Sequence, residues 1–258
     1  MAETTSPRSA WTGATALGHR GEIARGRTVL DDLEAALEHS GAVDDRALAS
    51  LAQSTRGSWL RQSGRHRLAL GRDGVAVYRA VDAGGPFPRH PWLRAALADG
   101  LIGLAADCLG LGRFDGSTRM LERAVELLDA TPDPDDWWTG SRVRLRHRWV
   151  TAENALYRGD ADTARREAAA AVASARDCPS PHHRIKTDLI AAAASAAAGD
   201  PAGAAASARD VVDEARSEAL VPLEWAGWQL LAGLAPGTEA DRCVAEAAER
   251  LTASGFFA

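Results

Sequence analysis

The chain has 258 residues, enough for one large domain or a continuous array of repeats. Its formal net charge of −5 argues against direct nucleic-acid binding, which usually needs a basic surface. No stretch approaches the roughly 18 uninterrupted apolar residues of a membrane-spanning helix, and the three cysteines form no Cys-x-x-Cys pair. We therefore expect reduced thiols in a cytoplasmic protein that does not contact membranes, and the excess of Ala, Arg, Gly and Asp suggests a high-GC bacterial source.

The first segment, residues 1–20, is rich in Ser, Thr and Gly and lacks the basic and apolar regions of a signal peptide, so we expect a flexible tail. Residues 21–258 are expected to form a single helical-repeat domain. Its first helix is predicted at 26–41, where Val29, Leu33, Ala36 and Leu37 share one face, and this helix would cap the array.

Five glycines recur along the chain at similar steps, each between two segments with helical periodicity. They are Gly64, Gly112, Gly159, Gly199 and Gly237, and the steps between them are 48, 47, 40 and 38 residues. Glycine reaches positive φ without a Cβ penalty and ends a helix, and the next polar residue can cap the following helix. Asp160, Asp200 and Thr238 are the expected caps. The pattern predicts an all-α chain of about five helical hairpins.

Alanine recurs at helical spacing in the second helix of the third and fourth hairpins. Small side chains allow helices to cross closely, and alanine has the highest helix propensity, so we expect packed helices there. The positions are Ala164, Ala168, Ala171 and Ala175 in the third hairpin and Ala204, Ala208, Val211 and Ala215 in the fourth. Between hairpins, the stretches 82–91, 131–136 and 178–183 are too rich in Pro and Gly to be helical.

The segment SRVRLRHRWV, residues 141–150, is the strongest candidate for binding chemistry. Arg142 and Arg146 stack at i, i+4 and could clamp a carboxylate or phosphate, because a guanidinium pairs such groups through two hydrogen bonds. The alternative is a solvated helix whose arginines pair with acids such as Glu153, Glu167 or Asp162. No cofactor is implied, and none of the common nucleophile, zinc or phosphate-loop motifs occurs, so we expect no enzymatic activity.

Three smaller features leave alternatives open. Cys178, His182 and His183 could bind a metal, but adjacent histidines on a helix diverge, which favours a polar loop and no metal site. Of the doublet Trp137 and Trp138, one is expected in the core and the other is either an exposed contact point or packed on a loop. The end of the chain, SGFFA, is expected to fold back over the last helix.

Charge is uneven along the chain. Residues 54–94 hold eight Arg against two Asp, and residues 199–250 hold ten acidic residues against four Arg. This polarity could orient a partner or allow a homo-oligomer through head-to-tail association, and it could equally be the composition of exposed helix faces.

The glycine-hinged segments resemble the tetratricopeptide repeat. The closest copy is NALYRGDADTARREAAAAVASA at 154–175, and CLGLGRFDGSTRMLERAVELL at 108–128 is similar. The resemblance implies a right-handed α-solenoid whose first helices line a concave face that receives a peptide or protein. Transferred position by position, it implies that the following residues line that face: Ser54, Ser58, Arg61, Asp99, Ile102, Arg146, Trp149, Glu153, Lys186 and Leu189.

Two functions follow from these features. The first is a non-catalytic scaffold that binds a protein or peptide in the concave groove. Its expected partner-binding residues are Ser58, Arg61, Arg142, Arg146, Trp149, Glu153, Lys186 and Leu189. The second is a regulatory module that senses an anionic small molecule, or a short peptide signal, against Arg142 and Arg146.

Overall fold

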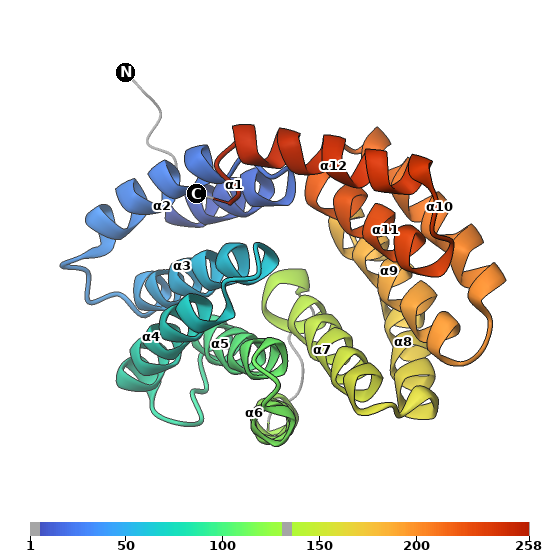
Figure 1. The fold of residues 1–258 in the computed structure, drawn as a ribbon. Helices are drawn as coiled ribbons and strands as arrows, with labels where there is room; N and C mark the ends of the chain where they lie inside the picture. Colours follow the sequence, from blue (N-terminus) through green and yellow to red (C-terminus); the bar gives the residue numbers. More distant parts are fainter. Residues whose placement is uncertain (1–5, 131–135, 258) are drawn as a thin grey trace. The chain divides into compact units, whose positions relative to one another are not determined.

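The computed structural model describes residues 6–130 and 136–257, and over these residues the chain forms only helices (Figure 1). The all-α prediction is therefore confirmed for the described part of the chain. The elements in order are α1 (Pro7–His19), α2 (Ile23–Leu37), α3 (Val43–Gln62), α4 (His66–Gly84), α5 (Pro91–Gly110), α6 (Phe114–Asp129), the π-helical turn η1 (Trp137–Ser141), α7 (Arg142–Arg158), α8 (Ala161–Ala175), α9 (Pro181–Ala197), α10 (Pro201–Ser217), α11 (Val221–Leu234) and α12 (Thr238–Ala253).

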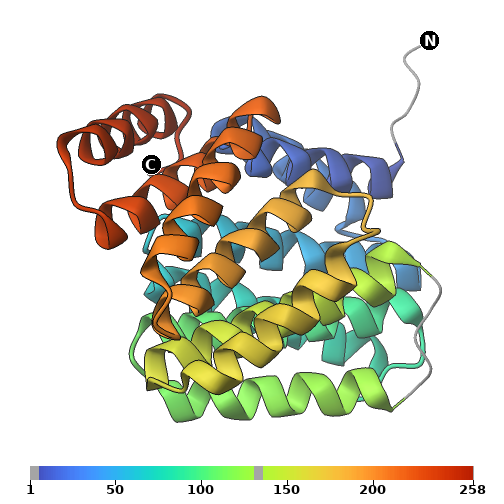
Figure 2. The same ribbon diagram turned by 90° about the vertical axis from the view of Figure 1, so that its right-hand side faces the viewer.

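The contacts divide the chain into two compact units where the sequence predicted one domain over 21–258. The first unit is Met1–Gly18 with Ile23–His147, and the second is His19–Glu22 with Arg148–Ala258. The division falls inside α7, which is why a search for linker composition does not find it. In the first unit α3 packs on both α4 and α5, and α5 packs on α6. In the second unit α9 packs on α8, α10 and α11, which lie beside it in both views (Figures 1 and 2).

Four of the five predicted glycine hinges are confirmed. Gly64, Gly112, Gly159 and Gly199 lie between paired helices with φ from 71° to 94°, the left-handed region that glycine favours. After Gly159 and Gly199 the predicted aspartate caps also form: the carboxylate of Asp160 accepts a hydrogen bond from the Thr163 N–H at 3.0 Å, and Asp200 accepts from the Gly203 N–H at 2.9 Å.

The left-handed hinge predicted at the fifth glycine, Gly237, is wrong. Gly237 has φ −177°, an extended conformation open to any residue, and it is the N-cap of α12. Thr238 is the first helical residue and does not cap the helix. The break between α11 and α12 includes Ala235 and Pro236, and proline cannot continue a helix, so the chain turns there without a left-handed glycine.

The tail predicted at 1–20 includes helix α1. Trp11, Ala14 and Gly18 are buried on one face of it, at positions i, i+3 and i+7. The indole N–H of Trp11 donates to the Thr55 hydroxyl on α3 at 3.0 Å. The Ser, Thr and Gly content concealed this apolar stripe, because glycine is usually read as a helix breaker. Here Gly18 lies within the helix, and its missing side chain lets the Trp59 ring pack on the helix backbone. Residues 1–5 of the predicted tail lie outside the described part.

The helix predicted at 26–41 is α2, displaced by three residues at its start. Its buried face consists of Ile23, Gly26, Leu30, Leu33 and Leu37, so it is rotated from the predicted one: Leu33 and Leu37 are buried as expected, whereas Ala36 is exposed.

The alanine positions behave as predicted in the second unit. Every predicted alanine of α8 and α10 is buried, as is Val211. The end of the chain also folds back as expected, with Phe256 buried against Trp225 and the Ser254 hydroxyl donating to the Gly21 carbonyl at 2.7 Å. Of the break predicted at 131–136, only Asp136 lies in the described part.

Candidate functional site

The three predicted binding arginines of the first unit lie in its interior. Arg61 on α3 donates through one nitrogen, Nη1, to both Asp73 on α4 and Asp107 on α5, each at 2.8 Å. Arg142 donates to Asp99 at 2.5 Å, and Arg146 donates to the other oxygen of the same carboxylate. These side chains form a buried ion-pair network, and the guanidinium groups point away from solvent. Ser58, another predicted residue of this unit, is half-buried and accepts a hydrogen bond from Gln62.

Asp73, like Asp107, is fully buried in this network. Its carboxylate fits against Gly57 and Gly103, where an added Cβ would lie 2.8 Å and 2.4 Å from it, so both positions require glycine. Burial raises the pKa of Asp73 to about 7, although the nearby Arg61 opposes the shift. Burial also lowers the pKa of Arg146, and its attraction to the nearby carboxylates, Asp99 above all, opposes that shift. The geometry stabilises the interior and offers no open anion site at Arg142 and Arg146.

The predicted residues of the second unit form a separate group. The indole N–H of Trp149 donates to the Thr187 hydroxyl at 2.8 Å, and its ring stacks on His183 with ring centroids 5.3 Å apart. Leu189 belongs to an apolar cluster between α9, α10 and α11. Only Glu153 and Lys186 are partly exposed, and they pair with each other at 3.0 Å. Of this group, therefore, only one ion pair reaches the surface.

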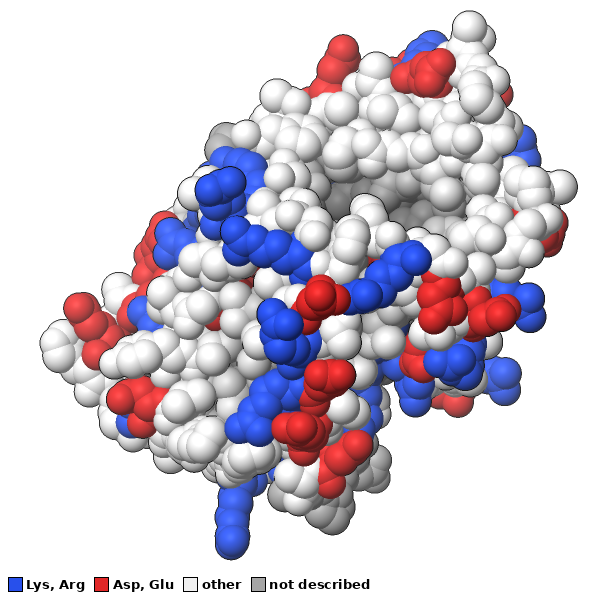
Figure 3. All heavy atoms as spheres, turned by 60° about the horizontal axis from the view of Figure 1, so that its bottom comes forward, with Lys and Arg blue, Asp and Glu red and all other residues white. Residues whose placement is uncertain are grey.

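Some of the uneven charge along the sequence is paired by contacts within each unit. In the first unit Arg56 and Arg79, from the basic stretch, pair with Glu34 on α2. In the second, Glu224 pairs with Arg216 and Arg250. Basic and acidic side chains accordingly lie interspersed on the face shown in Figure 3. The count over residues 54–94 missed the pairs of Arg56 and Arg79 because Glu34 lies outside that stretch.

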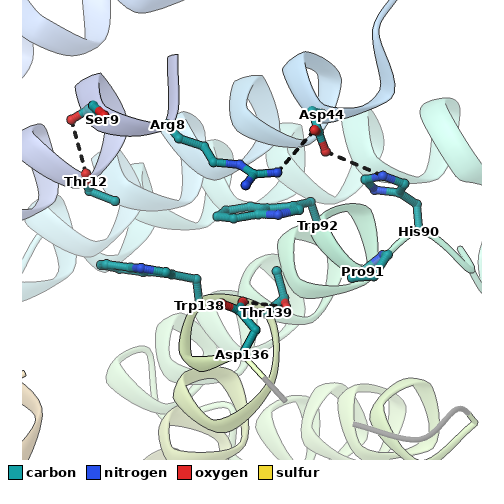
Figure 4. A pocket seen from close by; sticks show the side chains of 10 residues that line it. All are labelled: Arg8, Ser9, Thr12, Asp44, His90, Pro91, Trp92, Asp136, Trp138 and Thr139. Carbon is teal, nitrogen blue, oxygen red and sulfur yellow. Dashed lines mark hydrogen bonds and ion pairs between the residues drawn. The ribbon is translucent and has the colours of Figure 1, made fainter. Parts of the chain in front are cut away.

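A pocket of about 540 Å³ lies in the first unit and is the strongest candidate site (Figure 4). Most of its lining residues belong to the first turns of four helices, α1, α3, α5 and η1, or directly precede them. Two half-buried indoles supply its apolar surface and several ionisable and hydroxyl groups its polar surface. The lining residues are Arg8, Ser9, Thr12, Asp44, His90, Pro91, Trp92, Asp136, Trp138 and Thr139.

A third tryptophan holds the two pocket indoles in place. Trp11 is buried, and its ring meets Trp92 edge-on, with centroids 6.1 Å apart and an interplanar angle of 86°. It meets Trp138 in the same manner, at 5.4 Å and 69°. Edge-to-face contacts of this kind are favourable for aromatic rings. Because Trp11 is also tied to α3 through Thr55, the indoles of the pocket rest on a fixed support.

The polar groups are arranged differently at the two tryptophans. At Trp92 the Arg8 guanidinium lies 4.3 Å above the ring and pairs with Asp44 at 3.2 Å. The other oxygen of Asp44 lies 3.5 Å from Nε2 of His90. At Trp138 the neighbouring carboxylate is Asp136, whose Oδ2 accepts from the N–H and the hydroxyl of Thr139 and so caps η1. Among the described residues, no cation is stacked on Trp138.

The sequence indicated one part of this pocket and missed the rest. Of the Trp137–Trp138 doublet, Trp138 is the residue that lines the pocket. Arg8, Ser9 and Thr12 were assigned to a tail, and nothing in the sequence linked Asp44 to Trp92. The signal that could have found α1 is the spacing of Trp11, Ala14 and Gly18.

Two further findings concern other site types. Among the described residues, no group of three or more His, Cys, Asp or Glu side chains could hold a metal ion. Two of the residues weighed as metal ligands make other contacts. His183 is hydrogen-bonded to the Ser180 hydroxyl, and the Cys178 thiol donates to the Ser180 carbonyl. No helix in the described ranges is long and apolar enough to cross a membrane.

Comparison of the chain with protein-family models, with curated proteins and with solved structures finds no match in any of the three.

Proposed function

We propose that this chain is a non-catalytic helical module that binds a short peptide, or a segment of a protein, in the pocket between Trp92 and Trp138. One observation carries the proposal: a pocket of about 540 Å³ with two half-buried indoles and charged groups around them. Tryptophan and arginine dominate the binding energy of protein interfaces, and concave sites with a few polar groups are the usual ligand sites.

The tetratricopeptide resemblance supports the same class of function. Four glycine-hinged hairpins and the contacts of α3 with α5 and of α9 with α11 are compatible with stacked helical repeats. We extend the proposal to a degenerate helical-repeat scaffold of a bacterial cytoplasm, where the three free cysteines would stay reduced. The site differs from the groove inferred by transfer, because none of those ten residues lines the pocket and five of them are buried.

The second function, sensing of an anionic small molecule at Arg142 and Arg146, has less support. Both guanidinium groups already donate to Asp99, and an incoming anion would have to displace a buried carboxylate. We therefore favour the peptide-binding module.

Selection from a random peptide display library tests the proposal. Wild-type protein should enrich a sequence motif, and capture of the enriched peptides should fall at least about tenfold with Trp138→Ala, because the ring is a central contact. Trp228→Ala in the second unit is the matched control and should capture like wild type. Circular dichroism checks that each variant is folded. Equal capture by Trp138→Ala and wild type would reject the pocket as the site.

A further inference from the structure

We propose that the pocket binds a basic side chain, arginine above all, which stacks on Trp138 and pairs with Asp136. The inference rests on the proposed peptide-binding function and names the chemistry of the peptide. It starts from an arrangement that the chain already contains.

That arrangement is the set Arg8, Trp92 and Asp44. The guanidinium lies over the indole face and is held there by a carboxylate from another helix. Cation–π attraction and an ion pair act together on one group, and arginine suits both because its planar charge stacks while its edge donates hydrogen bonds. Half of the Arg8 side chain stays exposed, so the arrangement forms at the rim of the pocket without full burial.

The second tryptophan of the pocket also has a carboxylate nearby in the lining, that of Asp136, but none of the described cations is stacked on it. Trp138 and Asp136 are two residues apart and both line the pocket (Figure 4). One oxygen of Asp136, Oδ2, is used to cap η1, which leaves Oδ1 for a donor from outside. In the described part of the chain the three cation–π contacts involve the rings of Trp92, Phe87 and Trp11, and none involves Trp138.

The charge balance of the lining agrees with a cationic ligand. Arg8 supplies one positive charge against the carboxylates of Asp44 and Asp136, so with His90 neutral the formal sum is −1. The helix N-termini around the pocket favour anions. The chain already provides those anions, since Asp44 lies in the first turn of α3 and Asp136 caps η1. The pocket therefore leaves a position for a cation beside Trp138.

The indole resonances of the intact chain provide the readout. The protein has eight tryptophans and hence eight indole N–H signals in a ¹⁵N-labelled sample, of which those of Trp92 and Trp138 are assigned from Trp92→Phe and Trp138→Phe. The probes are acetylated, amidated Gly-Arg-Gly and the same peptide with citrulline, glutamate or leucine in the centre. Citrulline keeps the shape of arginine and removes its charge.

We expect the arginine peptide to shift the Trp138 signal and to bind about tenfold more tightly than the citrulline peptide. Asp136→Asn keeps the capping acceptor and removes the charge, so it should weaken arginine binding about two- to fivefold. Asp160→Asn makes the same change at the cap of α8 and should leave binding unchanged.

Equal affinity for the arginine and citrulline peptides, or tighter binding of the glutamate or leucine peptide at the same signals, would overturn this inference and leave the peptide-binding function standing. Absence of any shift up to about 10 mM arginine peptide would also overturn it. If the display selection enriched no peptide dependent on Trp138, the proposed function and this inference would fall together.

Discussion

The substitution Asp73→Asn removes a buried titrating group and should change how stability depends on pH. The Asp73 carboxyl is fully buried between Gly57 and Gly103, and burial raises its pKa from 3.8 to about 7. The charged groups around it are Arg61 on α3, Asp107 on α5 and Arg146 on α7. His66, which lies on α4 like Asp73, is near Asp107. Asparagine has the same shape and mimics the protonated form.

The sign follows from the proton balance. Between pH 3.8 and about 7 the folded protein holds a proton on Asp73 that the unfolded chain has released, so raising the pH through this range lowers the free energy of unfolding. Each pH unit within the range costs about 1.4 kcal/mol. From pH 5 to pH 8, wild type should therefore lose roughly 3 kcal/mol relative to Asp73→Asn, and the difference should level off above pH 7.

Urea unfolding at pH 5, 6, 7 and 8, followed by circular dichroism, measures this difference. If the two compact units unfold in separate transitions, only the transition of the unit that contains Asp73 should move. Asp82→Asn on the exposed side of the same helix is the control and should follow the wild-type profile. A difference between wild type and Asp73→Asn that stays constant from pH 5 to pH 8 would refute the reasoning, since it would mean that Arg61 keeps Asp73 ionised.

Substitutions at Arg146, Gly103 and Asp200 test the packing by chemical unfolding. Arg146→Ala leaves the buried Asp99 with one partner fewer and should destabilise the protein by about 3 kcal/mol, whereas a loss under about 1 kcal/mol would mean that the pair is effectively exposed. Gly103→Ala pushes a Cβ into the Asp73 carboxylate and should lower the free energy of unfolding by about 1–3 kcal/mol. Gly71 is a helix position with open space around it, so Gly71→Ala should raise that free energy by up to about 1 kcal/mol. Equal effects of the two substitutions would contradict the close approach of Gly103 to Asp73. Asp200→Ala should cost about 1 kcal/mol and Asp200→Asn much less, because asparagine still accepts the Gly203 N–H, and an equal loss for both would argue against the cap.

The helical hairpins could be predicted because their signals are local. A Gly-Asp pair contains both the residue that ends one helix and the residue that caps the next, as Gly159 and Asp160 do. Alanine at helical spacing likewise identified the buried faces of α8 and α10. A helix break does occur at Gly237, but its predicted left-handed conformation was wrong, because a proline already ends the helix before it and a glycine alone does not show which conformation it adopts.

The arginine network could not be predicted from its own segment. Arg142 and Arg146 sit on a helix that reads as charged and solvated, and their partner Asp99 lies 43 and 47 residues away on α5. The sequence correctly suggested that arginines pair with acids on neighbouring helices, as Arg148 does with Glu167. The burial of these arginines decides between a ligand clamp and an interior ion pair. It depends on how four helices pack together, so the sequence of one helix does not predict it.

The pocket escaped prediction for the same reason. Its residues come from four separate segments, and one of them, α1, read as a tail because a short Ser- and Gly-rich stretch lacks obvious periodicity. The Trp137–Trp138 doublet was the one local sign of this pocket, because Trp138 lines it, but it did not identify Arg8, Asp44 and Trp92.

The most direct test of the central claim is the dissociation constant of one display-selected peptide, measured by calorimetry with wild-type protein and with Trp138→Ala. The pocket account predicts a Kd at least about tenfold higher for the variant, with the Trp228→Ala control equal to wild type. A folded Trp138→Ala variant that binds the peptide with the wild-type Kd would contradict it.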